Sequence, residues 1–179
     1  MSSLELQNNR LTGTVPTSLS NWIEPKWLLL GNNELGGEFC VNVRGMQDSV
    51  VLSLMNNSFT GRFRFDVSIS LAVVDLSWNE FSGELSATLM SPLVTLQVLM
   101  LGHNKFHGRI PPWIWNLPTL QVLDLSNNYL SGPFSGNFSN LRGFIDNASG
   151  EFLNQSSANV PNGFVILVSG VRVRNPRLS

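Results

Sequence analysis

The sequence predicts a solenoid in which each coil adds one short strand to a parallel β-sheet. Three observations indicate this fold. The phrase L-x-L-x-x-N-x-L/F-x-G, with Val replacing the first Leu once, occurs six times. Its asparagines follow one another at steps of 22 to 25 residues, and apolar residues alternate with variable ones where each phrase begins. Self-similarity at this period is typical of coils that stack to bury a common core.

The repeated phrase extends from the first residues through most of the chain. It occurs as LELQNNRLTG (4–13), LLLGNNELGG (28–37), LSLMNNSFTG (52–61), VDLSWNEFSG (74–83), LMLGHNKFHG (99–108) and LDLSNNYLSG (123–132). Its asparagines are Asn9, Asn33, Asn57, Asn79, Asn104 and Asn128. Its glycines are Gly13, Gly37, Gly61, Gly83, Gly108 and Gly132. We expect each phrase to form one coil.

Each recurring residue of the phrase has a physical reason. In a strand, the two leucines of L-x-L point to one side and fill the interior, while the residues between them face solvent on the concave surface. The chain then leaves the strand inside a packed stack, where backbone donors and acceptors lie away from water. An Asn amide offers both kinds of partner, so stacked asparagines can satisfy the turns of adjacent coils. The Gly permits a backbone conformation or a close approach that a side chain would block.

The residues after the glycines indicate a family. The stretches GTVPTSLSNW (13–22) and GRIPPWIWNLPTLQVL (108–123) resemble the plant-type leucine-rich repeat, whose consensus continues G-x-I-P-x-x-L-x-x-L-x-x-L. The resemblance covers residues 1–144, about six repeats. It implies a right-handed leucine-rich-repeat solenoid, α/β or mainly β, with the parallel sheet on the concave face. It also implies a second short strand at T/S-G-x-I-P and helical, irregular or 3-10 turns on the convex face.

The repeat register fails after residue 144. The stretch DNASGEFLNQSSANVPNG (146–163) is rich in Asn, Ser and Gly, and is expected to be a loop. It is followed by FVILVSGVRVRN (164–175), two β-rich runs around Ser169 and Gly170 that can pair as a hairpin. Residues 145–179 therefore form either a non-repeat island, like those that interrupt many plant receptor ectodomains, or a degenerate C-terminal cap.

The outward positions of the predicted sheet are the candidate binding surface. Trp27, Leu29, Met55, Trp78 and Met100 make this strip more apolar than a solvated face requires, which is typical of partner sites. The alternative is that outward β-branched residues only favour the strand. In each coil, the outward residue predicted to lie nearest the repeat Asn is, in order, Gln7, Asn32, Met55, Trp78, His103 and Asn127. The predicted ligand-binding residues are Trp27, Leu29, Met55, Asp75, Trp78, Met100, His103 and Asp124.

No catalytic residue, metal site or cofactor is predicted. His103 and His107 lie in one coil, but no cysteine or patterned acidic residue completes a metal set, so both are expected to face solvent. The glycines follow the repeat rather than a phosphate loop, and the protein-kinase signatures do not occur. The net charge of -1 gives no footprint for nucleic acid. Cys40, the only cysteine, is expected to be a small buried hydrophobe, and Trp113 and Trp115 to pack on the convex side.

Other features concern the parent protein and its location. The sequons at Asn56, Asn137, Asn147 and Asn154 favour a glycosylated, secreted parent. No apolar run reaches the roughly 18 to 20 residues of a membrane span, and the N-terminus lacks the features of a signal peptide. The cysteine-paired cap of the family is absent and Met1 falls within the first repeat. The chain therefore resembles an internal slice of a larger ectodomain or a truncated gene copy.

The resemblance implies recognition rather than catalysis. We expect the concave face to bind a peptide or protein ligand on a plant plasma-membrane receptor-like protein, in defence or developmental signalling. A membrane span in the parent, or a co-receptor, would transmit the event. Two alternatives remain open: the extracellular part of a receptor serine/threonine kinase, whose kinase domain would belong to a longer parent, and a secreted polygalacturonase-inhibitor-like protein.

Overall fold

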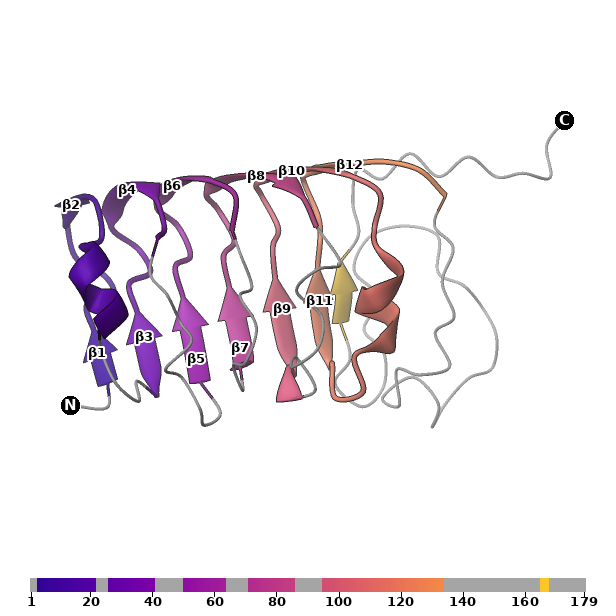
Figure 1. The fold of residues 1–179 in the computed structure, drawn as a ribbon, viewed down its shortest axis with the longest axis horizontal. Coiled ribbons are helices and arrows are strands. Elements are labelled where there is room, and N and C mark those ends of the chain that lie inside the picture. The colour runs from indigo at the N-terminus through magenta and orange to yellow at the C-terminus, as the bar shows by residue number, and fades with distance from the viewer. Residues whose placement is uncertain are drawn as a thin grey trace, which may run out of the picture.

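Two parallel sheets extend along the solenoid, as Figure 1 shows for the strands from β1 to β12. The computed structural model describes residues 3–21, 26–40, 50–63, 71–85, 95–133 and 165–167. The first sheet has seven strands in the order β1-β3-β5-β7-β9-β11-β13, namely Ser3–Glu5, Trp27–Leu29, Val50–Ser53, Leu71–Asp75, Val98–Met100, Val122–Asp124 and Val165–Leu167. The second has six in the order β2-β4-β6-β8-β10-β12, namely Thr12–Gly13, Glu34–Glu38, Ser58–Gly61, Glu80–Glu84, Lys105–Gly108 and Tyr129–Leu130. The short 3-10 helices η1 and η5 are Thr17–Asn21 and Pro112–Asn116. The predicted fold class is confirmed.

The first sheet forms because its strands stack the apolar residues of L-x-L in register. Leu28 pairs with Leu52, Leu52 with Val74, and Val74 with Leu99, all in parallel. These residues point into the core, where none exposes more than 2% of its surface. In the second to sixth coils, the inward residues of L-x-L are Leu28, Leu30, Leu52, Leu54, Val74, Leu76, Leu99, Leu101, Leu123 and Leu125. The residue between each pair therefore points outward, away from the core.

Aromatic side chains fill the core beneath the second sheet. Phe59 and Phe81 stack with their ring centroids 6.0 Å apart, and Phe81 and Phe106 stack at 6.5 Å. These residues occupy the L/F position of the repeat in three successive coils. On the convex side, η5 carries Trp113 and Trp115 into the core, as predicted, and the Trp113 indole N–H donates to the carbonyl of Leu85 at 3.3 Å. These contacts join neighbouring coils, as expected of a stacked solenoid.

The second strand lies earlier in the repeat than the family consensus implied. In β4, β6, β8 and β10 it begins at the residue after the repeat Asn and ends at the repeat Gly or one residue later. The reason is that the Asn side chain of the next coil accepts a hydrogen bond from the N–H of the second residue of this segment, which holds it extended against its neighbour. The I-P residues that follow the Gly lie outside these strands.

The repeat glycines serve both purposes expected of them. Each has a positive φ, between 75° and 97°, in the region that glycine populates most readily. In addition, the residue that follows one glycine lies over the glycine of the next coil. A Cβ built on Gly61 would come within 2.8 Å of Glu38 Cγ, and one on Gly83 within 2.9 Å of Arg62 Cγ. The glycines therefore let side chains lie flat along the second sheet.

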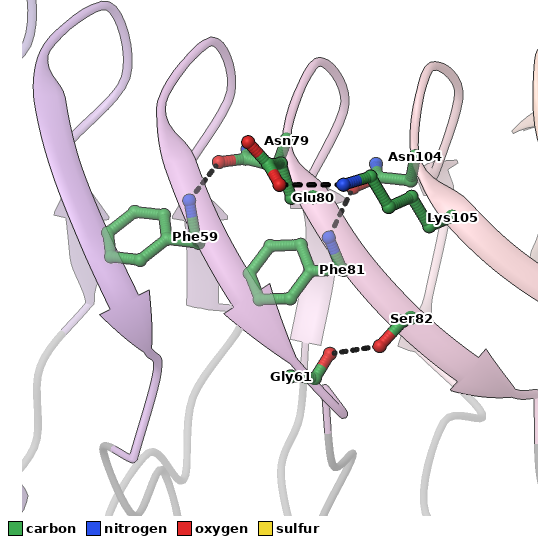
Figure 2. A network of polar contacts seen from close by, with 8 residues as sticks. All are labelled: Phe59, Gly61, Asn79, Glu80, Phe81, Ser82, Asn104 and Lys105. Atoms are coloured by element: carbon green, nitrogen blue, oxygen red, sulfur yellow. Dashed lines mark hydrogen bonds and ion pairs between the residues drawn. The ribbon is translucent and has the colours of Figure 1, made fainter.

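The repeat asparagines connect adjacent coils through two kinds of hydrogen bond. Asn104 Oδ1 accepts a bond from the backbone N–H of Phe81, in the preceding coil, at 3.0 Å. Its Nδ2 donates to the Leu76 carbonyl of that coil at 2.9 Å, and to two carbonyls of its own turn. Figure 2 shows the same arrangement one coil earlier, where Asn79 Oδ1 accepts from the Phe59 N–H at 3.0 Å. The equivalent bonds are made by Asn33, Asn57 and Asn128.

Asn9, in the first coil, differs from the other repeat asparagines. Its Nδ2 donates to the carbonyls of Leu6 and Gln7 in its own turn, both at 3.1 Å, and the residue is exposed. Within the described part of the chain, no backbone N–H donates to Asn9 Oδ1. The predicted row of structural asparagines is therefore confirmed, with one member that closes its own turn without joining two coils.

The strand β13 extends the first sheet beyond the six repeats. It pairs in parallel with β11, with Val122 opposite Val165 and Asp124 opposite Leu167. The predicted hairpin would pair this strand with residues 171–174, which lie outside the described residues. The division of the chain at residue 144, and the choice between an island and a cap, stay predictions.

The inter-coil role of the asparagines predicts a large difference between Asn104→Ala and Asn9→Ala. Removing the Asn104 amide leaves the Phe81 N–H and the Leu76 carbonyl unpaired in a buried site, at about 1 to 3 kcal/mol for each group. We expect Asn104→Ala to lower the free energy of unfolding by about 2 to 4 kcal/mol. Asn9→Ala, at an exposed site, should lower it by about 0.5 kcal/mol or less. Urea denaturation measures both, and equal losses would contradict the inter-coil role.

Candidate functional site

The outward residues of the first sheet form straight rows across the coils. Ser3, Trp27, Val51, Val73 and Val98 pair successively, so their side chains share the face turned away from the core. A second row contains Glu5, Leu29, Ser53, Asp75, Met100 and Asp124. Neighbouring members lie about 4.7 to 4.9 Å apart, the spacing of paired strands. We call this surface the outer face; it is the surface that the sequence analysis predicted to be concave.

A third row borders the outer face where the chain leaves the first sheet. Its members lie immediately before the repeat asparagines and have φ between 49° and 60°, in the left-handed region. We call it the left-handed row, and it consists of Asn8, Asn32, Asn56, Trp78, His103 and Asn127. Asn is the residue other than Gly that tolerates this conformation best. This explains why Asn occupies four of the six positions.

Side-chain contacts run along the left-handed row. Asn32 Nδ2 donates to Asn8 Oδ1 at 2.7 Å, and Asn56 Nδ2 donates to Asn32 Oδ1 at 2.9 Å. Farther along, the rings of Trp78 and His103 stack with centroids 3.6 Å apart and an interplanar angle of 11°. Asn127 Nδ2 lies 2.9 Å from His103 Nε2. The row thus contains a ladder of side-chain amides from the first three coils, which we call the amide ladder. It is followed by the aromatic stack of Trp78 on His103, and the His103 ring contacts the side-chain amide of Asn127.

The predicted ligand-binding residues differ in how much of their surface is exposed to solvent. Trp27 and Trp78 are the most open, with 48% and 55% of their surface exposed. Five others are partly buried but belong to the outer face or its border: Leu29, Met55, Asp75, Met100 and His103. Two indoles at this level of exposure indicate that the outer face offers apolar contact surface to a partner.

The prediction that Asp124 faces solvent is wrong. Only 6% of the residue is exposed, and its Oδ1 accepts a hydrogen bond from the Ser126 N–H at 2.8 Å. The carboxylate lies against Gly102 of the preceding coil, where a Cβ would approach Oδ2 to 2.5 Å. Asp75, at the same repeat position, closes a similar turn by accepting bonds from the N–H and Oγ of Ser77. Both carboxylates therefore stabilise turns.

The prediction of the outward residue nearest the repeat Asn is wrong in two coils. In the third coil the residue in line with Trp78 and His103 is Asn56, not Met55. Met55 lies one residue earlier, beside Gly31. The same shift separates Gln7 from Asn8. Counting back one residue from each repeat Asn would have found the full row from sequence. Its left-handed backbone, however, is visible only in the coordinates.

The sequons can be compared with the structure at one position. Asn56 is exposed, and its Nδ2, the atom that would carry a glycan, faces Asn32 through their hydrogen bond. Asn137, Asn147 and Asn154 lie outside the described residues. Glycosylation at all four stays a prediction.

The position of Cys40 differs from the prediction. Cys40 was expected to be buried but is exposed, because it lies beyond the end of β4; its Sγ is 3.9 Å from Glu38 Oε2.

On the second sheet, Lys105 Nζ donates to Glu80 Oε2 at 2.7 Å (Figure 2). This hydrogen bond, followed by the charge of Glu80, raises the pKa of Lys105. The stabilisation is present below the ordinary lysine pKa and is lost as the pH rises through the folded-state value.

Family comparisons agree with this geometry. Models described as leucine rich repeat match residues 69–130 and residues 1–22. Receptor-like protein 39 of Arabidopsis thaliana is 34% identical over 124 residues, and Receptor-like protein 18 of the same plant is 32% identical over 194 residues. The solved ectodomain of the Arabidopsis thaliana receptor kinase SOBIR1 is 31% identical, with a TM-score of 0.60, over 71% of this chain and 70% of that one.

The chain belongs to the leucine-rich-repeat family of plant receptor-like proteins. The alignment with Receptor-like protein 39 includes 67% of this chain but only 14% of the relative. The alignment with Receptor-like protein 18 includes 93% of this chain and 22% of the relative. Two further solved ectodomains share the fold of this leucine-rich-repeat chain. That of GASSHO1/SCHENGEN3 from Arabidopsis thaliana is 31% identical with a TM-score of 0.64, over 72% of this chain and 16% of that one. That of the Arabidopsis receptor kinase HAESA is 28% identical with a TM-score of 0.54, over 74% and 26%.

The described residues of this leucine-rich-repeat chain contain no group of three or more His, Cys, Asp or Glu residues arranged to hold a metal ion. Among the same residues, no helix combines the length and apolar character needed to cross a bilayer. The candidate site is the outer face with its left-handed row, where Trp27 and Trp78 are 48% and 55% exposed.

The contact between Asp124 and Gly102 predicts a specific coupling. Gly102→Ala should push the buried carboxylate off the Ser126 N–H and lower the free energy of unfolding by about 1 to 3 kcal/mol. Asp124→Ser introduces the smaller residue found at the same row position in the third coil, Ser53. In that background the cost of Gly102→Ala should fall by at least about half, since sites in contact are not additive. Additive losses in a double-mutant cycle by urea denaturation would contradict the packing described here.

Proposed function

We propose that the outer face binds a peptide or protein ligand for a plant cell-surface receptor-like protein. The observation that carries the proposal is the exposure of Trp27 and Trp78 on the outer face and its border, together with partly buried Leu29, Met55 and Met100. Large aromatic residues dominate binding energy at protein interfaces. The HAESA ectodomain was solved with a peptide hormone and a co-receptor, which supports the same mode of action here.

The biological role follows from family membership. We place the parent of this chain at the plasma membrane, with the repeats outside the cell, acting in defence or developmental signalling. The ectodomain would bind the ligand and leave transmission to a membrane span of the parent or to a co-receptor. No chemical step is assigned to the repeats, because the carboxylates of Asp75 and Asp124 on the outer face accept hydrogen bonds that close turns.

A receptor kinase is the second candidate for the parent. It is favoured by the solved ectodomains of GASSHO1/SCHENGEN3, HAESA and SOBIR1, which belong to plant receptor kinases. The curated receptor-like proteins favour the first candidate. Kinase motifs encoded downstream of these repeats in the full transcript would decide for the receptor kinase.

A selection of random peptides on the immobilised chain tests the proposal. We expect peptides with dissociation constants in the micromolar range or tighter, competing with one another for the outer face. Val73→Arg places a charged side chain in the middle of that face and should weaken binding by about tenfold or more, as for a residue central to an interface. Tyr129→Ser is the matched control, because it removes a side chain that is 70% exposed on the second sheet.

The control variant gives the test a clear contrary result. Binding that survives Val73→Arg but is lost in Tyr129→Ser would move the binding surface to the second sheet. Circular dichroism and urea denaturation of both variants would show that each keeps the fold.

A further inference from the structure

Trp78 occupies a backbone conformation that disfavours a bulky residue. Its φ is 57°, while the equivalent positions of the other coils hold Asn or His. A bulky side chain in the left-handed region is an outlier, and its backbone is strained. Burial does not offset this strain, because 55% of the residue is exposed. Strain of this kind is found where a binding function maintains it.

Trp78 also interrupts the contacts along the left-handed row. The amide ladder ends at Asn56, and the aromatic stack begins at Trp78 in the next coil. The two coils are adjacent, since the Asn56 N–H donates to the Ser77 carbonyl at 2.9 Å. Within the described part of the chain, no hydrogen bond reaches Asn56 Oδ1 or leaves Trp78 Nε1. Asn56 Oδ1 and the indole N–H of Trp78 therefore give two adjacent coils one acceptor and one donor that a ligand can bond.

This arrangement matches the chemistry of a peptide. A peptide unit offers an N–H for the Asn56 oxygen and a carbonyl for the Trp78 indole N–H. His103 covers one face of the indole at 3.6 Å, so an incoming aromatic ring would pack edge-to-face against the exposed part of the stack. The adjoining rows hold Val73 and Met100, which suit apolar side chains of a peptide better than the hydroxyls of a sugar.

We propose that Asn56, Trp78 and His103 form a subsite for an aromatic residue of a peptide ligand and for the backbone amide beside it. In this subsite His103 is a positioning residue, held by Asn127 and stacked against the indole. This subsite rests on the proposed function, that the outer face binds a peptide or protein ligand. It specifies which part of that ligand contacts Asn56, Trp78 and His103.

Exchanging residues between equivalent repeat positions tests the subsite without disturbing the fold. Trp78→Asn introduces the residue that occupies the same position in four other coils, so the backbone conformation is retained. Tyr129→Ser is the control, because it removes an exposed aromatic side chain from the second sheet, away from the outer face, and introduces the residue that follows the repeat Asn in the third coil, Ser58. Both variants and the wild-type chain are produced in bacteria, where Asn56 carries no glycan, and are compared by urea denaturation.

The three chains are then used to select peptides from the same random displayed library. We expect wild type and Tyr129→Ser to enrich peptides with an aromatic residue at one fixed position, and Trp78→Asn to lose that preference. A peptide selected on wild type should bind Trp78→Asn about tenfold more weakly, and replacing its aromatic residue by Ala should cost wild type the same factor and Trp78→Asn almost nothing.

The remaining outcomes separate the subsite from the broader function. Peptides that bind the outer face equally well in wild type and Trp78→Asn would overturn the subsite and leave the proposed function standing. Failure of any peptide to bind would overturn both. Binding of a cell-wall oligosaccharide that is lost in Trp78→Asn, with no aromatic peptide enriched, would assign the indole to a sugar and overturn the peptide subsite.

Discussion

The hydrogen bonds between each repeat asparagine and the preceding coil are the interaction on which the rest of the structure depends. They satisfy backbone groups that the solenoid buries wherever the chain leaves the first sheet. Because the Asn of one coil bonds both the inner turn and the second strand of its neighbour, it fixes the two sheets relative to each other. The straight rows of the outer face follow from this register. The surface that meets a ligand is thus set by an amide in the interior.

The same asparagine explains the left-handed row beside it. To bring its side chain under the turn, the backbone passes through a left-handed residue just before the Asn, and this residue projects its side chain to the border of the outer face. The position is therefore structurally demanding and exposed at once. Asn meets the demand with little strain, so Trp78 is the residue whose presence the fold does not explain. The fold tolerates it because the coils on either side hold the backbone in place.

The sequence was sufficient to predict those parts of the structure that the repeat itself requires. The inward leucines, the asparagines, the glycines and the pairing of Trp27 with its neighbours all follow from one period and from strand alternation. Met55 lies beyond the end of β5, where alternation no longer gives the row to which a side chain belongs. Asp124 follows the alternation, but its carboxylate is buried against Gly102 of the preceding coil. The burial of Cys40 was an inference from residue type alone, and its position beyond β4 leaves it exposed. The strain at Trp78 and its stack on His103 were also beyond prediction, since no propensity indicates which ring lies over which.

The side chains that lie over the repeat glycines have a consequence for how such a solenoid can change. Glu38, Arg62, Glu84 and Arg109 occupy equivalent places in four successive coils, each against the glycine of the next. Their charges therefore alternate along the second sheet. Loss of the third or the fourth coil by recombination would place two like charges side by side, whereas loss of both together would preserve the alternation. The charge pattern of the second sheet thus repeats every two coils, although one repeat is the unit of the fold.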